Sequence, residues 1–314
     1  MKRKKIDLSV IIVTFNSAPH IRACLDSVLG TKQMCGFEIS VIDNHSSDGT
    51  PEIVATYPVH LTVNAANLGF ARAVNIGMRE ARGAFFLLLN DDTEISDHVF
   101  DELLAFLQRT PRAAVVGPRV MLPDGRPEPF QLKFPGLAKE FVHANSGLLR
   151  LAGFALKGMA KTGRRSDMRT RTVDYVSGAC FLIRRESVEQ VGLLDERYFI
   201  YVEEVDWCWR LKKAGWHVYS YPHVSILHHF GQSTKQKPWG QTINWLLVER
   251  YRSILYFFKK NYGAARYFLL RLIVLQGFSF RFAGAWIAGV FSGKNKAATV
   301  TNYQAIITTA FKGI

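Results

Sequence analysis

Residues 85–93 constrain the fold of this chain more than any other segment. Phe85–Leu89 is wholly apolar and has the length of a β-strand, and Asn90, Asp91 and Asp92 follow it at once. Such a run predicts a strand buried on both faces. Two adjacent carboxylates repel each other unless a positive charge lies beside them. The segment alone leaves two interpretations open: a divalent metal holding a phosphorylated ligand, or an acidic turn that caps the next helix.

The first 117 residues alternate between strand-like and helix-like segments. Strands are predicted at Leu8–Thr14, Glu38–Ile42, Leu61–Val63, Phe85–Leu89 and Ala113–Val116, and helices at about 20–31, 50–56, 70–82 and 97–109. This alternation predicts an α/β fold with a mainly parallel, Rossmann-like sheet and helices on both faces. Ligands of such sheets bind beyond the carboxyl ends of the strands.

Polar residues follow four of these strands at that edge. They are Thr14 and Asn16, then Asp43 and Asn44, then Asn64 and Asn67, and finally Asn90, Asp91 and Asp92. One acidic turn is ordinary, but four polar strand ends at one edge favour a nucleotide site.

Length and charge narrow the choice of partner. The 314 residues suffice for one large α/β domain with an appendage, or for two domains. The net charge of +14 calls for an anionic partner: nucleic acid, anionic lipid or a nucleotide. Residues 245–314 hold ten Lys or Arg and one acid, Glu249.

The four cysteines show no metal-site spacing, so reduced thiols in a cytosolic setting are expected. The basic start before Leu8–Val13 resembles a signal peptide only superficially, and a first core strand is the better interpretation.

We expect a catalytic domain over residues 1–240, with a nucleotide-sugar half (1–117) and an acceptor half (118–240), followed by a helical extension over 241–314. Residues 118–172 are predicted to be irregular, and 173–230 to hold a strand at Tyr175–Ile183. Projected as one helix at about 100° per residue, residues 252–281 place six basic side chains within roughly 140°. Gly263 and Gly277 are the residues at which this helix could break. Trp and Tyr accompany this stripe, which favours a helix lying in a membrane interface. The alternative is packing on the catalytic domain or on a second subunit, so a homo-oligomer stays open.

Several motifs together resemble the family 2 glycosyltransferases, inverting enzymes with the GT-A fold, and among them the bacterial rhamnosyltransferase-like members. The resemblance covers about residues 7–235. It is carried by Val10–Asn16, Val41–Thr50, Asn67–Asn75, Leu89–Thr93, Ser177–Arg184, Phe199–Arg210 and Ile226–Ser233, in this order. Any one match is weak, and their ordered combination is strong.

The resemblance implies roles for individual residues. It places the nucleotide-sugar donor against Thr14, Asn16, Asp43, Asn67, Gly69, Asn75, Asn90 and Asp91. It makes Asp92 the principal ligand of Mn²⁺ or Mg²⁺, with Asp91 as an auxiliary and His228 reaching the metal or the diphosphate. Hard cations of this kind suit carboxylate and phosphate oxygens, and a nitrogen ligand leans toward Mn²⁺.

An inverting transfer also needs a base to remove the acceptor's hydroxyl proton. Family members commonly carry Glu-Asp where this chain has Glu203-Glu204, so Glu204 aligns with the base and Asp206 is the reserve candidate. The alternative is that these acids pair with Arg210 or cap the helix predicted over 207–214.

The expected function is therefore metal-dependent transfer of a sugar, with dTDP-rhamnose as the donor implied by the resemblance, to a saccharide or lipid-linked saccharide acceptor. The product would serve cell-surface polysaccharide synthesis. The enzyme would lie at the cytoplasmic face of the membrane, held peripherally by the anionic surface. Two alternatives are a sugar nucleotidyltransferase, which needs a glycine-rich phosphate loop that Thr14–Pro19 lacks, and a nucleic-acid-binding protein. The acid-lined edge argues against nucleic acid.

Overall fold

The computed structural model describes residues 6–128, 133–151, 168–229, 245–292 and 297–314. The chain divides into two compact units. The first takes in Met1–Lys133, Thr162–Phe199 and Glu203–Gln236, and the second takes in Phe134–Lys161, Ile200–Val202 and Lys237–Ile314. Every residue predicted to bind the nucleotide or the metal, or to act as the base, belongs to the first unit.

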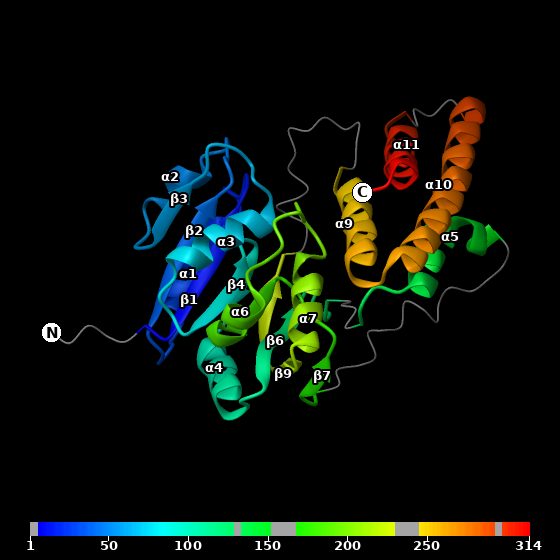
Figure 1. The fold of residues 1–314 in the computed structure, drawn as a ribbon. Helices are drawn as coiled ribbons and strands as arrows, with labels where there is room; N and C mark the ends of the chain where they lie inside the picture. Colours follow the sequence, from blue (N-terminus) through cyan, green and yellow to red (C-terminus); the bar gives the residue numbers. More distant parts are fainter. Residues whose placement is uncertain (1–5, 129–132, 152–167, 230–244, 293–296) are drawn as a thin grey trace. The chain divides into compact units, whose positions relative to one another are not determined.

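The first unit is built on one mixed sheet. Its described strands follow the order β3-β2-β1-β4-β8-β6-β9-β5, and β7 pairs with β9 (Figure 1). Their bounds are β1 Leu8–Thr14, β2 Phe37–Asp43, β3 His60–Val63, β4 Phe85–Asn90, β5 Thr93–Ile95, β6 Ala113–Met121, β7 Arg171–Val173, β8 Cys180–Arg184 and β9 His217–His228. Strands β1 to β4 are parallel, and β8 runs antiparallel to both β4 and β6. The predicted parallel half is confirmed, whereas β5, β7 and β9 were not predicted.

Helices cover both faces of this sheet because successive side chains of a buried strand point in opposite directions. The helices of the first unit are α1 Ile21–Gly30, α2 Thr50–Val54, α3 Phe70–Glu80, α4 Val99–Arg109, α6 Arg185–Val191 and α7 Glu203–Lys213. Val10 and Ile12 of β1 belong to the core shared with α1 and α4. Ile11, between them, faces α3, where a Cβ on Gly77 would lie 2.8 Å from its side chain.

One expectation for the middle of the chain is confirmed only in part, and another is wrong. The strand predicted over 175–183 begins only at Cys180, because the Ser177 hydroxyl accepts a hydrogen bond from the backbone N–H of Ala179 (3.3 Å) and forms a turn there. The stretch predicted to be irregular contains helix α5, Leu137–Leu151. Tertiary packing on another helix stabilises it, a contribution that local sequence does not reveal.

The second unit is helical. It contains α5 with α9 Trp245–Asn261, α10 Ala264–Ser292 and α11 Ala297–Lys312. Gly277 of α10 packs so closely on α5 that a Cβ there would lie 2.8 Å from the Cβ of Ala144. Buried Glu140 of α5 pairs with Arg250 of α9 at 3.5 Å. By length and composition, Ala264–Gly289 could cross a membrane, with a mean hydropathy of 1.4 and most of its surface unburied.

The single basic stripe projected over 252–281 is wrong, because one helix does not span these residues. Helix α9 ends at Asn261, and Gly263 has a φ of +83° before α10 begins. Several of the basic side chains also bind groups within the unit. Arg271 donates to the backbone oxygen of Ala310 (2.7 Å), and Arg281 donates to that of Ala144 (2.9 Å). Helix α10 also exposes large apolar side chains: Phe268, Leu269, Leu272, Phe280, Trp286 and Ile287.

Candidate active site

The ends of β1 and β2 are joined by hydrogen bonds between the predicted nucleotide residues. The Thr14 hydroxyl donates to Oδ1 of Asp43 at 2.8 Å, and both residues are buried. The backbone N–H of Ser46 donates to Oδ2 of Asp43 at 2.8 Å, and its hydroxyl donates to Oδ1 at 2.5 Å. The Asp43 carboxylate is therefore held in one orientation before any ligand arrives.

Asn16 connects the same two strand ends from the other side. It has a φ of +53°, a conformation in which Asn is enriched among non-glycine residues. Its backbone N–H donates to the Ser46 hydroxyl (2.8 Å), and its side-chain oxygen accepts from the backbone N–H of Ser47 (2.9 Å). Thr14 and Asn16 at the end of β1 and Asp43 at the end of β2 thus belong to one hydrogen-bond network.

Asn67 and Gly69 shape the loop that precedes α3. The side-chain oxygen of Asn67 accepts from the backbone N–H of Gly69 at 3.0 Å. Gly69 has a φ of +84°, and a Cβ there would lie 2.6 Å from the backbone oxygen of Phe199. That oxygen also accepts from the backbone N–H of Phe70 at 2.7 Å. Only glycine allows this close approach between two distant segments.

Asn75 is buried in α3, away from the strand ends. Its amide nitrogen donates to the backbone oxygen of Leu194 (2.9 Å) and to Oε1 of Glu196 (3.0 Å), and its oxygen accepts from the backbone N–H of Leu194 (3.1 Å). Hydrogen bonds from Asn75, Arg79 and Arg72 lower the pKa of Glu196 to about 2. This geometry favours a role for Asn75 in holding residues 194–196.

The three polar residues after β4 take different environments. Asn90 ends the strand, and its backbone N–H donates to the oxygen of Ala179 at 3.0 Å. The buried Asp91 carboxylate accepts a hydrogen bond from the Ser17 hydroxyl in the loop after β1. The Asp92 carboxylate, also buried, lies 3.1 Å from Nε2 of His228. Asp91 therefore faces the β1 loop, and Asp92 faces β9.

Strand pairing brings His228 to Asp92. Strand β5 runs antiparallel to β9, with Thr93 directly opposite His228. The second ring nitrogen, Nδ1, lies 3.3 Å from Oε2 of Glu128. Burial lowers the pKa of His228, but hydrogen bonds and charge from Asp92 and Glu128 outweigh it and raise the pKa to about 9.

Asp92 and His228 fit a divalent cation that is shared with a substrate. They place one carboxylate oxygen and one imidazole nitrogen 3.1 Å apart, close enough to share one cation. Among the residues that the structure describes, no set of three or more His, Cys, Asp or Glu is arranged as a complete metal site. Mg²⁺ and Mn²⁺ are commonly held by one or two carboxylates together with substrate phosphates. The donor set therefore suits a metal that binds with a diphosphate.

The acidic cluster lies at the start of α7. Burial raises the pKa of Glu204 to about 7, although hydrogen bonds from the backbone N–H groups of the first turn oppose the shift. Burial and the charge of Glu204 raise the pKa of Glu203, whose Oε2 is buried with no hydrogen-bond partner in the described structure. Glu204 therefore titrates near neutral pH, where a general base is most effective.

Asp206 has a different environment. It is fully buried, lies 3.0 Å from the guanidinium of Arg210, and accepts from the Tyr198 hydroxyl at 3.3 Å. This geometry favours the ion-pair alternative for Asp206 and leaves Glu204 as the stronger candidate base.

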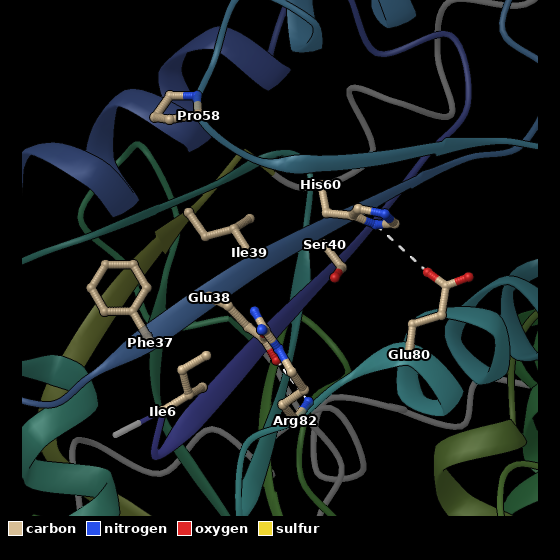
Figure 2. A pocket seen from close by; sticks show the side chains of 9 residues that line it. All are labelled: Ile6, Phe37, Glu38, Ile39, Ser40, Pro58, His60, Glu80 and Arg82. Atoms are coloured by element: carbon tan, nitrogen blue, oxygen red, sulfur yellow. Dashed lines mark hydrogen bonds and ion pairs between the residues drawn. The ribbon is translucent and has the colours of Figure 1, made fainter. Parts of the chain in front are cut away.

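A shallow cavity of about 660 Å³ lies at the opposite edge of the sheet (Figure 2). It is lined by Ile6, Phe37, Glu38, Ile39, Ser40, Pro58, His60, Glu80 and Arg82. Glu38 at the start of β2 pairs with Arg82 at 2.5 Å, and His60 pairs with Glu80 at 3.6 Å. Because ligands of parallel sheets bind at the carboxyl ends, this cavity is not the nucleotide site.

Residues 9–192 match the family model described as "Glycosyl transferase family 2". The chain belongs to this family. It is 35% identical over 248 residues to an N-acetylglucosaminyl-diphospho-decaprenol L-rhamnosyltransferase from Mycobacterium tuberculosis, an alignment covering 74% of this chain and 78% of the relative. It is also 26% identical to the low-salt glycan biosynthesis hexosyltransferase Agl10 of Haloferax volcanii, over 71% of this chain and 67% of that protein.

Solved glycosyltransferase structures confirm the GT-A fold. The mannosyltransferase PcManGT from Pyrobaculum calidifontis, solved with GDP-Man and Mn²⁺, superposes with a TM-score of 0.55 at 17% identity. This match covers 98% of this chain and 89% of that one. The family and the fold together establish that the chain is a glycosyltransferase, as the sequence motifs predicted.

Three residues of the site network escaped the sequence analysis. Ser17 and Ser46 bond Asp91 and Asp43, and Glu128 bonds His228. Ser46 follows Asp43 within the Val41–Thr50 motif, so its contact with Asp43 could have been predicted from the sequence. Glu128 lies a hundred residues from its partner, and no local pattern marks it.

Proposed function

We propose that this glycosyltransferase moves rhamnose from dTDP-rhamnose to a lipid-linked saccharide, in a metal-dependent reaction with inversion at the anomeric carbon. The main support for a metal bound with the diphosphate is the short distance between the Asp92 carboxylate and the His228 imidazole at the carboxyl end of β4. The sugar and the acceptor follow the Mycobacterium tuberculosis relative, whose name specifies L-rhamnosyl transfer to a sugar-diphospho-decaprenol.

The residues divide the work as follows. Thr14, Asn16 and Asp43 hold the nucleotide. Asp92 and His228 would hold Mn²⁺ or Mg²⁺, with Asp91 as an auxiliary, and such an ion supplies Lewis-acid stabilisation of the negative charge on the diphosphate leaving group. Glu204 accepts the proton of the acceptor hydroxyl as this oxygen approaches the face opposite the leaving group. Its pKa of about 7 makes it both ionisable at neutral pH and basic enough to accept that proton.

A transfer assay tests the proposal. The full chain is incubated with dTDP-rhamnose, an N-acetylglucosaminyl-diphospho-polyprenol and Mn²⁺, and the lipid product is analysed by mass spectrometry and NMR. We expect the lipid to gain one deoxyhexose, whose anomeric configuration is opposite to that of the sugar donor. A product with retained configuration would refute inversion, and full turnover in EDTA would refute the metal.

We further propose that the exposed apolar face of α10 holds the enzyme on the cytoplasmic face of an anionic membrane. Phe268 and Leu272 are one helical turn apart and about half exposed, and residues 245–314 carry a strong excess of basic residues. Apolar burial combined with basic charge is the pattern of interfacial membrane binding.

Vesicle flotation tests this attachment. The double variant Phe268→Glu/Leu272→Glu should lose binding to vesicles that contain anionic lipid. Met34→Glu, which changes an exposed apolar residue of the first unit, is the matched control and should float like the unaltered protein. Equal flotation of all three proteins would overturn the membrane proposal.

A further inference from the structure

Glu128 occupies a defined position just beyond β6, in a part of the chain without a recognised motif. The chain turns back after β6, and Met121 pairs with Pro127 in an antiparallel bridge. The backbone N–H of Glu128 then donates to the oxygen of Val120 at 2.9 Å. Main-chain bonds therefore hold Glu128 in place independently of its side chain.

The side chain of Glu128 is directed at the imidazole of His228. Its Oε2 lies 3.3 Å from Nδ1, and both side chains are more than nine-tenths buried. The opposite ring nitrogen, Nε2, lies 3.1 Å from Oδ1 of Asp92. The ring is thus held between two carboxylates that approach its two nitrogens separately.

This arrangement matters because the two nitrogens of a metal-binding histidine do different work. The nitrogen that binds a metal must be free of its proton, and the other usually donates its N–H to a carboxylate or carbonyl that fixes the ring. Nε2 faces Asp92, so Nδ1 is the nitrogen that must carry the proton, and Glu128 is the group that accepts from it.

We infer that Glu128 is a positioning residue of the metal site. It holds the ring of His228 with Nε2 toward Asp92 and with the Nδ1 proton directed at its own carboxylate. The inference rests on the proposed function, because it takes Asp92 and His228 as the metal ligands. It goes beyond that function by assigning the metal site a residue that lies outside every motif.

Two other roles for Glu128 make different predictions. A direct metal ligand would need its charged oxygen, so an amide in its place would be as damaging as no side chain. A purely structural ion pair would stabilise the fold without changing the affinity for metal. A positioning residue acts only through His228.

The test measures Mn²⁺ affinity by the electron paramagnetic resonance signal of free Mn²⁺, with dTDP present and in a parallel series with UDP. Glu128→Ala should weaken Mn²⁺ binding about 10–100-fold. Glu128→Gln should weaken it less, because its amide oxygen still accepts from Nδ1. His228→Ala should weaken binding at least as much as Glu128→Ala, and adding Glu128→Ala to it should cause no further loss.

Glu94→Gln is the matched control. Glu94 lies 2.5 Å from Nε2 of His229, the residue next to His228, and it forms the same kind of pair. This variant should bind Mn²⁺ like the unaltered protein. Thermal unfolding of each variant shows whether a loss of affinity reflects a loss of fold.

The outcomes separate this inference from the proposed function. Unchanged Mn²⁺ affinity in Glu128→Ala overturns the inference alone. Equal losses in Glu128→Gln and Glu128→Ala, with a further loss in the double variant, indicate a direct ligand and also overturn it. Unchanged affinity in His228→Ala, or no Mn²⁺ binding by the unaltered protein with either nucleotide, overturns the proposed metal site and the inference with it.

Discussion

Replacing Glu204 with Gln should slow turnover by about 10²–10⁴-fold and at the same time stabilise the protein above neutral pH. The pKa of this carboxyl is about 7 in the folded chain against an ordinary value of 4.5. At 1.36 kcal/mol per pKa unit, ionising it in the folded state costs up to about 3 kcal/mol. The amide of Gln cannot ionise, so the variant avoids this cost and also lacks the base.

The sign of the pH dependence follows from the same difference. Between pH 4.5 and pH 7 the folded state binds more protons at Glu204 than the unfolded state does. The free energy of unfolding therefore falls as pH rises through this window. The unaltered protein should lose up to about 3 kcal/mol from this group by pH 8, whereas Glu204→Gln should not.

Urea unfolding at pH 5 and pH 8 measures the effect, with tryptophan fluorescence as the probe. Trp207 is a suitable reporter because it is buried in the same helix and stacks on Phe181. Glu189→Gln, at an exposed position, is the control and should follow the unaltered protein. Transfer assays at pH 8 should show a loss of about 10²–10⁴-fold for Glu204→Gln. Full activity, or an unchanged pH dependence of stability, would refute the assignment of Glu204.

Three further predictions concern other parts of the chain. Asp92→Asn should remove stimulation by Mn²⁺ in the transfer assay, and full stimulation would exclude Asp92 as a ligand. Gly69→Ala should destabilise the fold by about 1–3 kcal/mol through its positive φ alone, and further through the clash with the Phe199 oxygen; an unchanged urea midpoint would show that the loop relaxes freely. Arg250→Ala should cost about 3–5 kcal/mol because it leaves the fully buried Glu140 without its partner, and Arg250→Ala combined with Glu140→Gln should recover part of that loss.

Much of the first unit was predictable because its signals are local. The apolar runs that form β1 and β4 are bounded by polar turns, and both strands lie where the sequence predicted them. Parallel strands direct their carboxyl ends to one edge, so gathering Thr14, Asp43 and Asp92 at that edge needed only the order of the elements. The ordered motifs then predicted the family, which the family match confirms.

The second unit was predicted less well, for a physical reason. Helix α5 is stabilised by its packing on α10, which local sequence does not reveal. Gly263 and Gly277 were both candidate breaks, but only the structure shows that the chain breaks at Gly263 and that α10 runs through Gly277. A helical projection assumes a continuous helix, so the basic stripe drawn through that break does not exist. The bonds of Arg271 and Arg281 with backbone oxygens of other helices are equally invisible in the sequence.

The sequence by itself predicted the parallel half of the sheet, the edge at which the candidate site lies and the residue types that could bind a metal and a nucleotide. Only the tertiary structure decided how those residues are used. It turned Asp91 toward Ser17 and Asp92 toward His228, paired Asp206 with Arg210, and left Glu204 with a raised pKa. Strand periodicity and turns are properties of neighbouring residues, whereas the contacts of Asp91 with Ser17 and of Asp92 with His228 join segments that lie far apart in the sequence.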